Sequence, residues 1–239
     1  MANVYLQVDF KTGNIFQYSK AIQEGYESHI NTKGTESWRK IYKKGLYSKL
    51  ESISIRDSDF GKEISVATKL GNGDNAYLNF PLFDEKKNIA SYAESFIAVL
   101  PALKVGESYR FFPYNIKADT DKYAKIGFSV KLADLANETV LEGVDALLKL
   151  SYSYIKDGVP VVGDIPAIVW EEDYTGAKTM NKTAKNKFLY DVLIKNSSVS
   201  NQAPQTTATP ATATAPQAQT TAPAAPQVPA IDEHDDLPF

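Results

Sequence analysis

The chain has 239 residues, of which 43% are hydrophobic, so it can bury one large core or two small ones. It contains no cysteine, which excludes disulfides, thiol catalysis and thiolate metal sites. Its 26 basic and 29 acidic residues exclude a uniformly basic surface, so any nucleic-acid site must arise from local clustering.

The N-terminal segment predicts a β-hairpin. Residues 4–10 alternate between apolar and polar side chains, residues 11–14 supply turn formers, and residues 15–18 continue as a second strand. Residues 19–36 are polar and contain two glycines, which indicates a loop or a weak helix.

Residues 37–45 are the most concentrated basic and aromatic segment of the chain. Trp38, Ile41 and Tyr42 fall at positions i, i+3 and i+4, so one helical turn is expected to bring them together. Core packing is the alternative role for the two aromatic side chains, with the lysines as a solvated face.

Five strand candidates and one helix follow. The helix extends from Ile89 to Leu100 and is ended by Pro101. Three strands precede it and two follow it, which is the order of an OB fold, a five-stranded Greek-key barrel. The strand candidates are residues 46–56, 60–70, 77–80, 108–117 and 124–132.

The stretch 134–195 gives a weaker pattern. Residues 140–150 suit either a helix or a strand, and residues 149–156 alternate as an added strand would. Residues 165–170 are apolar but contain Pro166, which favours an edge position. Residues 181–195 carry apolar side chains at helical spacing and predict a helix that closes the folded body.

The composition changes completely after this helix. From Ser197 to Ala230 no residue is charged or aromatic, so the segment cannot offset its conformational entropy by burial and is expected to stay disordered. The organisation that follows is a folded body at 1–195, a linker at 196–230 and an acidic tail at 231–239.

Residues suited to catalysis are nearly absent. The two histidines, His29 and His234, lie far apart, and neither a zinc site nor a Ser-His pair is indicated. Residues 71–76 match a relaxed dinucleotide fingerprint, but a strand follows where that site needs a helix. Residues 171–173 are three acids, for which an exposed loop is favoured over a metal site. Neither an enzyme, a cofactor nor a metal is expected.

The stronger signal is for binding. Aromatic residues alternate with lysine and arginine through the body, as in proteins that stack bases and neutralise phosphates of single-stranded nucleic acid. In residues 108–117 both faces of the strand are aromatic, and the sequence pattern does not decide which of the two faces is buried. The candidate DNA-binding residues are Trp38, Arg39, Lys40, Tyr42, Lys43, Lys44, Tyr47, Arg56, Lys69, Tyr77, Arg110, Phe112 and Tyr114.

The end of the chain resembles that of single-stranded DNA-binding proteins. Bacterial members end in an acidic run followed by Ile or Leu, Pro and Phe behind a disordered linker, and this chain ends Asp235-Asp236-Leu237-Pro238-Phe239. Residues 12–18 and 43–47 resemble phage-encoded members. The resemblance implies an OB-fold body that covers and protects single strands during replication, recombination or repair.

It also implies that the tail docks replication and repair proteins. The predicted partner-binding residues are Asp232, Glu233, Asp235, Asp236, Leu237, Pro238 and Phe239. The tail is expected to compete with DNA for basic residues of the body, and Phe239 is expected to anchor partners.

The alternative function is an OB-like protein-interaction or scaffold module without nucleic-acid binding. The N-terminus lacks the features of a signal peptide, and no apolar run is long enough to span a membrane. A cytoplasmic location is therefore expected, that of a bacterial host if the protein is phage-encoded. The sequence does not decide whether the protein forms a homo-oligomer.

Overall fold

The computed structural model describes residues 2–30, 34, 36–59, 61–116, 125–142 and 147–197. These residues belong to the first of the two units into which the chain divides, residues 1–200. Residues 198–230 of the expected linker and the tail residues predicted to bind partners lie outside the described residues, so what is expected of them stays a prediction.

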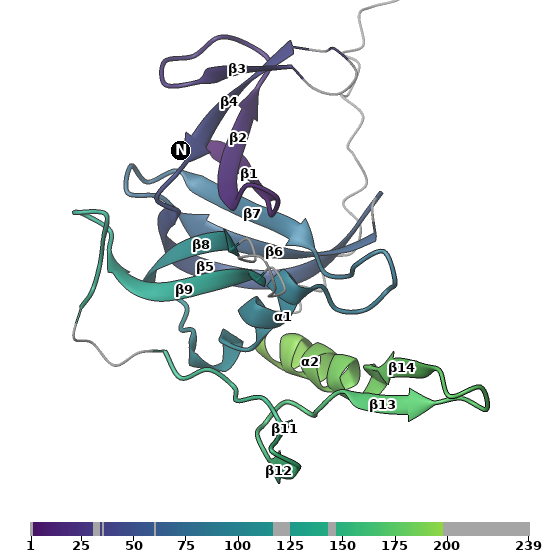
Figure 1. The fold of residues 1–239 in the computed structure, drawn as a ribbon. Coiled ribbons are helices and arrows are strands. Elements are labelled where there is room, and N and C mark those ends of the chain that lie inside the picture. Colours follow the sequence, from purple (N-terminus) through teal and green to yellow (C-terminus); the bar gives the residue numbers. More distant parts are fainter. Residues whose placement is uncertain are drawn as a thin grey trace, which may run out of the picture. The chain divides into compact units, whose positions relative to one another are not determined.

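The described part of the chain is mainly β, as the sequence predicts, and within it ten strands form one sheet (Figure 1). Two further pairs of strands form separate hairpins. In the order in which they lie side by side, the strands of the sheet are β10 (Thr139–Val140), β9 (Lys125–Asp134), β8 (Ser108–Ile116), β5 (Leu46–Ser58), β6 (Gly61–Lys69), β7 (Asn75–Pro81), β1 (Asn3–Asp9), β2 (Asn14–Ser19), β4 (Glu36–Tyr42) and β3 (Glu27–Ile30).

The predicted N-terminal hairpin is confirmed, but the closed five-stranded barrel is not found among the described residues. The β1–β2 hairpin, the β5–β6–β7 meander and the β8–β9 hairpin are all antiparallel. The free edge of β7 is occupied by β1, which pairs with it in parallel. The turn between β1 and β2 meets β8 through a side chain, because Asn115 Nδ2 donates to the carbonyls of Phe10 and Lys11, both at 3.0 Å.

The helical turn predicted for residues 37–45 is wrong. This segment forms strand β4, and β3 arises in the region assigned to a loop or weak helix. Strand β4 lies between β2 and β3, which satisfy its backbone groups on both sides. Aromatic and β-branched residues such as Trp38, Ile41 and Tyr42 fit a pleated sheet well, and tertiary pairing here overrides a short helical spacing.

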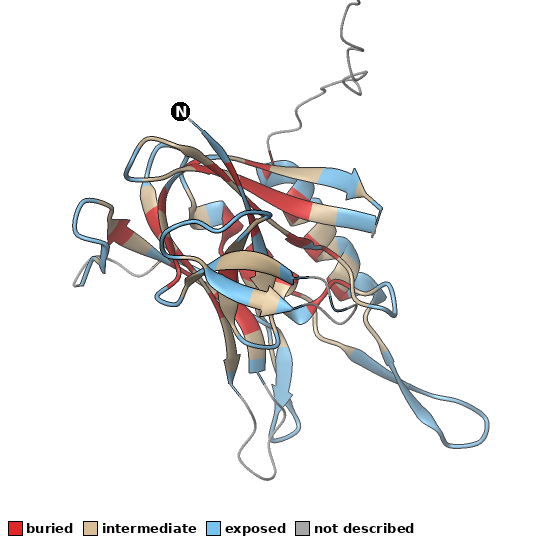
Figure 2. Ribbon diagram, turned by 90° about the horizontal axis from the view of Figure 1, so that it is seen from above, coloured by how far each residue is buried: buried red, intermediate tan, exposed pale blue. Residues whose placement is uncertain are grey.

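The core lies on one face of the sheet, under the helix α1 (Ser91–Ile97) and the short 3-10 helix η1 (Leu100–Ala102). Phe80 of β7, Phe96 of α1 and Phe128 of β9 are at most 1% exposed and meet at ring-centroid distances of 5.2–5.7 Å. The buried segments in Figure 2 follow the helices and the strands of the large sheet. The two separate hairpins outside this sheet are mostly exposed.

The predicted closing helix is confirmed as α2 (Thr183–Asn196), which buries Leu189 and Leu193. An ion pair joins it to α1, with Lys185 Nζ 2.7 Å from Glu94 Oε2 and both side chains largely buried. Burial and the carboxylate of Glu94 raise the pKa of Tyr152.

The region between β10 and α2 differs from what the sequence predicts. The expected added strand at 149–156 shrinks to β11 (Tyr154–Lys156), which pairs with β12 (Val159–Val161) and not with the large sheet. In the expected edge strand at 165–170, Ile165 is buried, and regular pairing begins only at β13 (Val169–Glu172) with β14 (Lys178–Asn181).

Candidate nucleic-acid interface

The burial of β8 decides which of its two aromatic faces is free. Tyr109 and Phe111 are 1% and 0% exposed, so they belong to the core. Because side chains alternate along a strand, Arg110, Phe112 and Tyr114 lie on the opposite face, which we call the outer face of the sheet.

Arg110 links the aromatic side chains of this outer face to the β4–β5 turn. Its guanidinium carbon lies 4.4 Å from the ring centre of Phe112 and 5.9 Å from that of Tyr47. Its Nε donates to the carbonyl of Lys44 at 2.6 Å, which fixes the plane of the group. Within the described residues the two terminal nitrogens have no hydrogen-bond partner, so they can reach a phosphate.

Gly45 permits this arrangement. Its φ is +85°, and a Cβ at this position would come 2.6 Å from the carbonyl oxygen of Phe111. A side chain would therefore push the β4–β5 turn away from β8. Because residue 45 is glycine, the carbonyl of Lys44 can stay against the guanidinium of Arg110.

Two lysines continue the outer face beyond Tyr47. Lys49 of β5 and Lys69 of β6 lie directly opposite each other in the ladder. Neither amine has an acidic partner within 4.0 Å in the described part of the chain. Like charges directly opposite each other destabilise a sheet, so this pair favours an anionic ligand.

A stacked tyrosine pair follows on the same face. Tyr77 of β7 is paired with Tyr5 of β1, and their rings lie 5.4 Å apart at an angle of 21°. Tyr5 is 61% exposed, so its ring can receive a base. We call seven outer-face residues of β8, β5, β6, β7 and β1 the outer-face band: Phe112, Arg110, Tyr47, Lys49, Lys69, Tyr77 and Tyr5.

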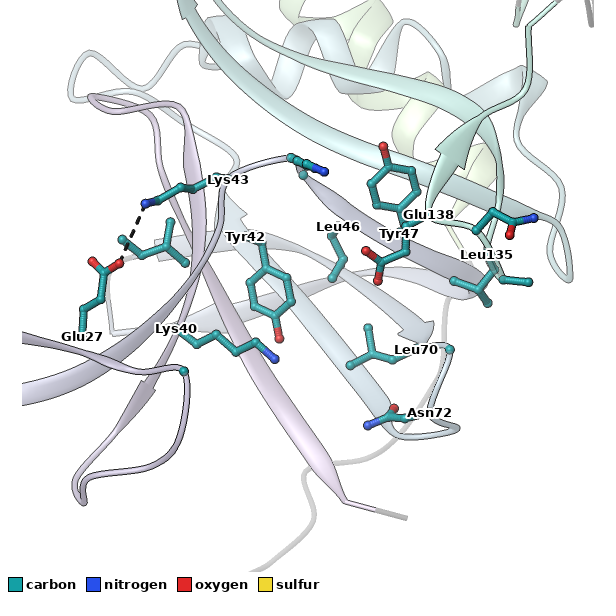
Figure 3. A pocket seen from close by; sticks show the side chains of 17 residues that line it. Glu27, Lys40, Tyr42, Lys43, Leu46, Tyr47, Leu70, Asn72, Leu135 and Glu138 are labelled. Atoms are coloured by element: carbon teal, nitrogen blue, oxygen red, sulfur yellow. Dashed lines mark ion pairs between the residues drawn. The ribbon is translucent and has the colours of Figure 1, made fainter.

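A groove of about 1210 Å³ opens at the end of the sheet next to the band. Lys40 and Tyr42 of β4 and the β4–β5 turn line one side, and the β6–β7 and β9–β10 turns line the other. Figure 3 shows Lys40, Tyr42 and Tyr47 among the side chains that line this space.

Both signs of charge are present in the groove. Lys40 Nζ lies 5.4 Å from the ring centre of Tyr42, and Lys43 lies 3.8 Å from Glu27 in an exposed pair. Burial, Tyr26 and Glu138 raise the pKa of Tyr42 to about 12, so its phenol is neutral at physiological pH. Because Lys49 and Lys69 of the outer-face band have no acidic partner in the described part of the chain, whereas Lys43 of the groove is paired with Glu27, the band is the stronger candidate for a polyanion.

Four other predicted binding residues belong neither to the band nor to the groove, although Tyr114 shares the outer face of β8 and Arg56 lines a hollow with Tyr5. The guanidinium of Arg56 is paired with Glu63 at 2.9 Å, which neutralises its charge. Trp38 and Arg39 point to opposite faces of β4, and Arg39 Nε is buried without a partner. Tyr114 covers Gly127 of β9, where a Cβ would overlap its hydroxyl.

The sequence reasoning missed Tyr5 and Lys49. Both could have been found from alternation, because Tyr5 stands between the inward Val4 and Leu6, and Lys49 between the inward Ser48 and Leu50. The groove wall at Leu135–Glu138 carries no comparable signal, since it approaches β4 only through the folding of the sheet.

No family model, curated protein or solved structure matches this chain. Within the described residues, no cluster of histidine and acidic side chains is suited to hold a metal ion. None of the described helices combines the length and apolar content of a membrane span.

Proposed function

We propose that this protein binds single-stranded DNA, with little dependence on sequence, through the outer-face band. The observation that carries the proposal is the unpaired Lys49–Lys69 pair, flanked by Tyr47 and Arg110 on one side and by stacked Tyr77 and Tyr5 on the other. Lysines at this position attract successive phosphates, and exposed rings stack bases of any identity.

The strand order supports an OB-type body. The order β9-β8-β5-β6-β7, with α1 between β7 and β8, is the order of OB-fold strands when the barrel is opened between the third and fifth strands. Strands β6 and β7 correspond to the second and third strands, the face on which OB folds bind oligonucleotides. Lys69 and Tyr77 lie on that face.

The C-terminal sequence supports a second part of the proposal. An acidic run closed by Leu237, Pro238 and Phe239 suits a partner pocket that is apolar, with a basic rim. We infer that the tail recruits replication, recombination or repair proteins to DNA held by the body.

The test is fluorescence anisotropy of a labelled oligo-dT titrated with the full-length chain at several salt concentrations. Tyr77→Ala should weaken binding about 5–150-fold, because each stacked base contributes about 1–3 kcal/mol, and it should leave the salt slope unchanged. Lys69→Ala should also reduce the log–log salt slope by about 0.7, because one phosphate is no longer neutralised.

Matched controls are available away from the band. Lys62→Ala removes a lysine paired with Asp57, and Tyr174→Ala removes a tyrosine that is 100% exposed on another hairpin. Both should bind like the wild type. Equal affinity for single- and double-stranded DNA, or equal effects of band and control variants, would refute the proposal.

A further inference from the structure

The β13–β14 hairpin presents an apolar pair to solvent. In its ladder Trp170 is paired with Met180, so both side chains lie on one face, and they are 62% and 53% exposed. The next pair on the same face is Glu172 with Lys178, 3.8 Å apart. We call these four residues the Trp170 face. It borders a hollow of about 460 Å³ lined by Trp170, Glu172 and Lys178.

Hydrogen bonds hold the hairpin in a defined shape. At its tip, Asp173 Oδ1 accepts from the backbone N–H groups of Thr175 and Ala177, at 2.8 and 3.0 Å. On the other face, Asn181 Nδ2 donates to Glu171 Oε1 at 2.6 Å. The Trp170 face is therefore presented by an ordered ribbon.

The ribbon nevertheless lacks a covering layer in the single chain. Residues 169–172 of β13 and 178–180 of β14 are all exposed. The hairpin is separate from the large sheet and projects beside α2 (Figure 1). A two-stranded hairpin alone is marginally stable in water. Tryptophan is enriched among the residues that dominate binding energy at protein interfaces, so a protein partner would supply the missing layer.

We propose that the Trp170 face docks onto the same face of a second copy of this chain. The charges favour this occupant, because the face carries one acid and one base in direct opposition, and is therefore self-complementary. A two-fold axis parallel to the strands places β13 over the β14 of the other copy. Trp170 then meets Met180 of the other copy, and Glu172 meets its Lys178, twice over.

The contact is small. One face of a short hairpin offers less than the roughly 800 Å² per partner of a standard stable interface, so the free chain associates weakly. Copies bound side by side on one strand experience effective concentrations that reach the millimolar range, which favours this contact. Binding to DNA would therefore be cooperative, with copies docking to one another along the strand. This consequence rests on the proposed function, whereas the docking itself does not.

The test is sedimentation velocity of the full-length chain, without DNA, over a wide concentration series. The wild type should show a sedimentation coefficient that rises with concentration. Trp170→Ala should weaken dimerisation by about 30-fold or more, as expected for a central tryptophan. Glu172→Lys and Lys178→Glu should each abolish it through two like-charge contacts, and Thr179→Lys, on the opposite face, should leave it unchanged.

A mixture of the Glu172→Lys and Lys178→Glu proteins separates docking from damage to the hairpin. Each variant keeps a like-charge pair within its own hairpin, yet the two proteins together restore both contacts between copies. The mixture should therefore associate as the wild type does. A mixture as weak as either variant alone, a monomeric wild type at every concentration, or an unaffected Trp170→Ala would overturn the proposal.

Binding of an oligonucleotide too short for two copies distinguishes the two proposals. Trp170→Ala should retain wild-type affinity for it. If this variant loses that affinity, the face belongs to the DNA site and the docking proposal is wrong. If the wild type self-associates as described but binds no oligonucleotide, the docking proposal stands and the proposed function fails.

Discussion

At the residue scale, Gly45 couples the stability of the protein to its candidate interface. Gly45→Ala should lower the free energy of unfolding by about 2–4 kcal/mol, because left-handed backbone and overlap with Phe111 both oppose a Cβ. Urea denaturation measures the change. Affinity for oligo-dT should fall as well, since the turn that carries Lys44 must move away from Arg110.

Gly73→Ala is the matched control for this substitution. Its φ is +87°, nearly the same as that of Gly45, but no atom lies within 4 Å of a Cβ there. It should lose only the backbone contribution, about 1–2 kcal/mol, and keep its DNA affinity. Equal losses in the two variants would show that the close approach to Phe111 has no energetic weight.

Single residues of the band could be predicted only in part. Tyr77 and Arg110 follow from alternation once Leu78 and Phe111 are assigned to the core. The opposition of Lys49 and Lys69 depends on the β5–β6 register, which a bulge between Leu50 and Ser52 shifts. Because a bulge adds one residue to one strand, pairings beyond it cannot be counted from the sequence.

At the element scale, the contact between α1 and α2 depends on a buried ion pair. Lys185→Met should lower the free energy of unfolding by about 3–5 kcal/mol, because it leaves the carboxylate of Glu94 buried without a countercharge. Adding Glu94→Gln to this variant should recover part of the loss. Thermal and urea unfolding both measure these changes in the free energy of unfolding.

Lys187→Met on the same helix gives the comparison. Lys187 pairs with Asp191 at 3.0 Å, but the two side chains are 78% and 63% exposed. The loss should stay below about 1 kcal/mol, because water screens such a pair. A Lys185 variant as stable as the Lys187 variant would contradict the role assigned to the buried pair.

Elements with strong periodicity were predictable, and those defined by their neighbours were not. The helix at 181–195 and the meander at 46–80 follow from apolar spacing and from the turn at Gly71–Asp74. The sequence wrongly predicts a helical turn in place of strand β4, because three of its side chains also fit helical spacing. Only the presence of β2 and β3 on either side decides between the two.

At the scale of the whole molecule, the charge of the tail should modulate DNA binding. Deleting residues 231–239 removes four acidic side chains and changes the formal net charge from −3 to +1. Affinity for oligo-dT should rise, more at low than at high salt, because repulsion of a polyanion is relieved and is screened by salt. Partner recruitment should be lost.

A chain of full length, with Asn or Gln at Asp232, Glu233, Asp235 and Asp236, separates charge from length. It should bind DNA as tightly as the truncated chain. Affinity unchanged from the wild type at low salt would show that the tail charge does not influence the interface.

The topology of the whole sheet was the least predictable level. The order of strands and helix along the chain predicts a five-stranded OB barrel, whereas the described residues form a ten-stranded sheet without a closed barrel. The sequence contains no signal that β1 pairs in parallel with β7, because Tyr5 and Tyr77 are 72 positions apart and share no pattern. The sequence likewise contains no signal that β11–β12 and β13–β14 pair as hairpins separate from the large sheet.

The parallel pairing of β1 with β7 imposes an order on biosynthesis. Strand β1 is synthesised before β7, its partner on the sheet, which ends at Pro81. Strands β5, β6 and β7 are joined by short turns and can assemble from local contacts, whereas pairing across 72 positions must close a long loop and is slow. The β1–β2 hairpin is therefore synthesised before the meander but docks after it, and until it docks the edge of β7 is open to other nascent chains.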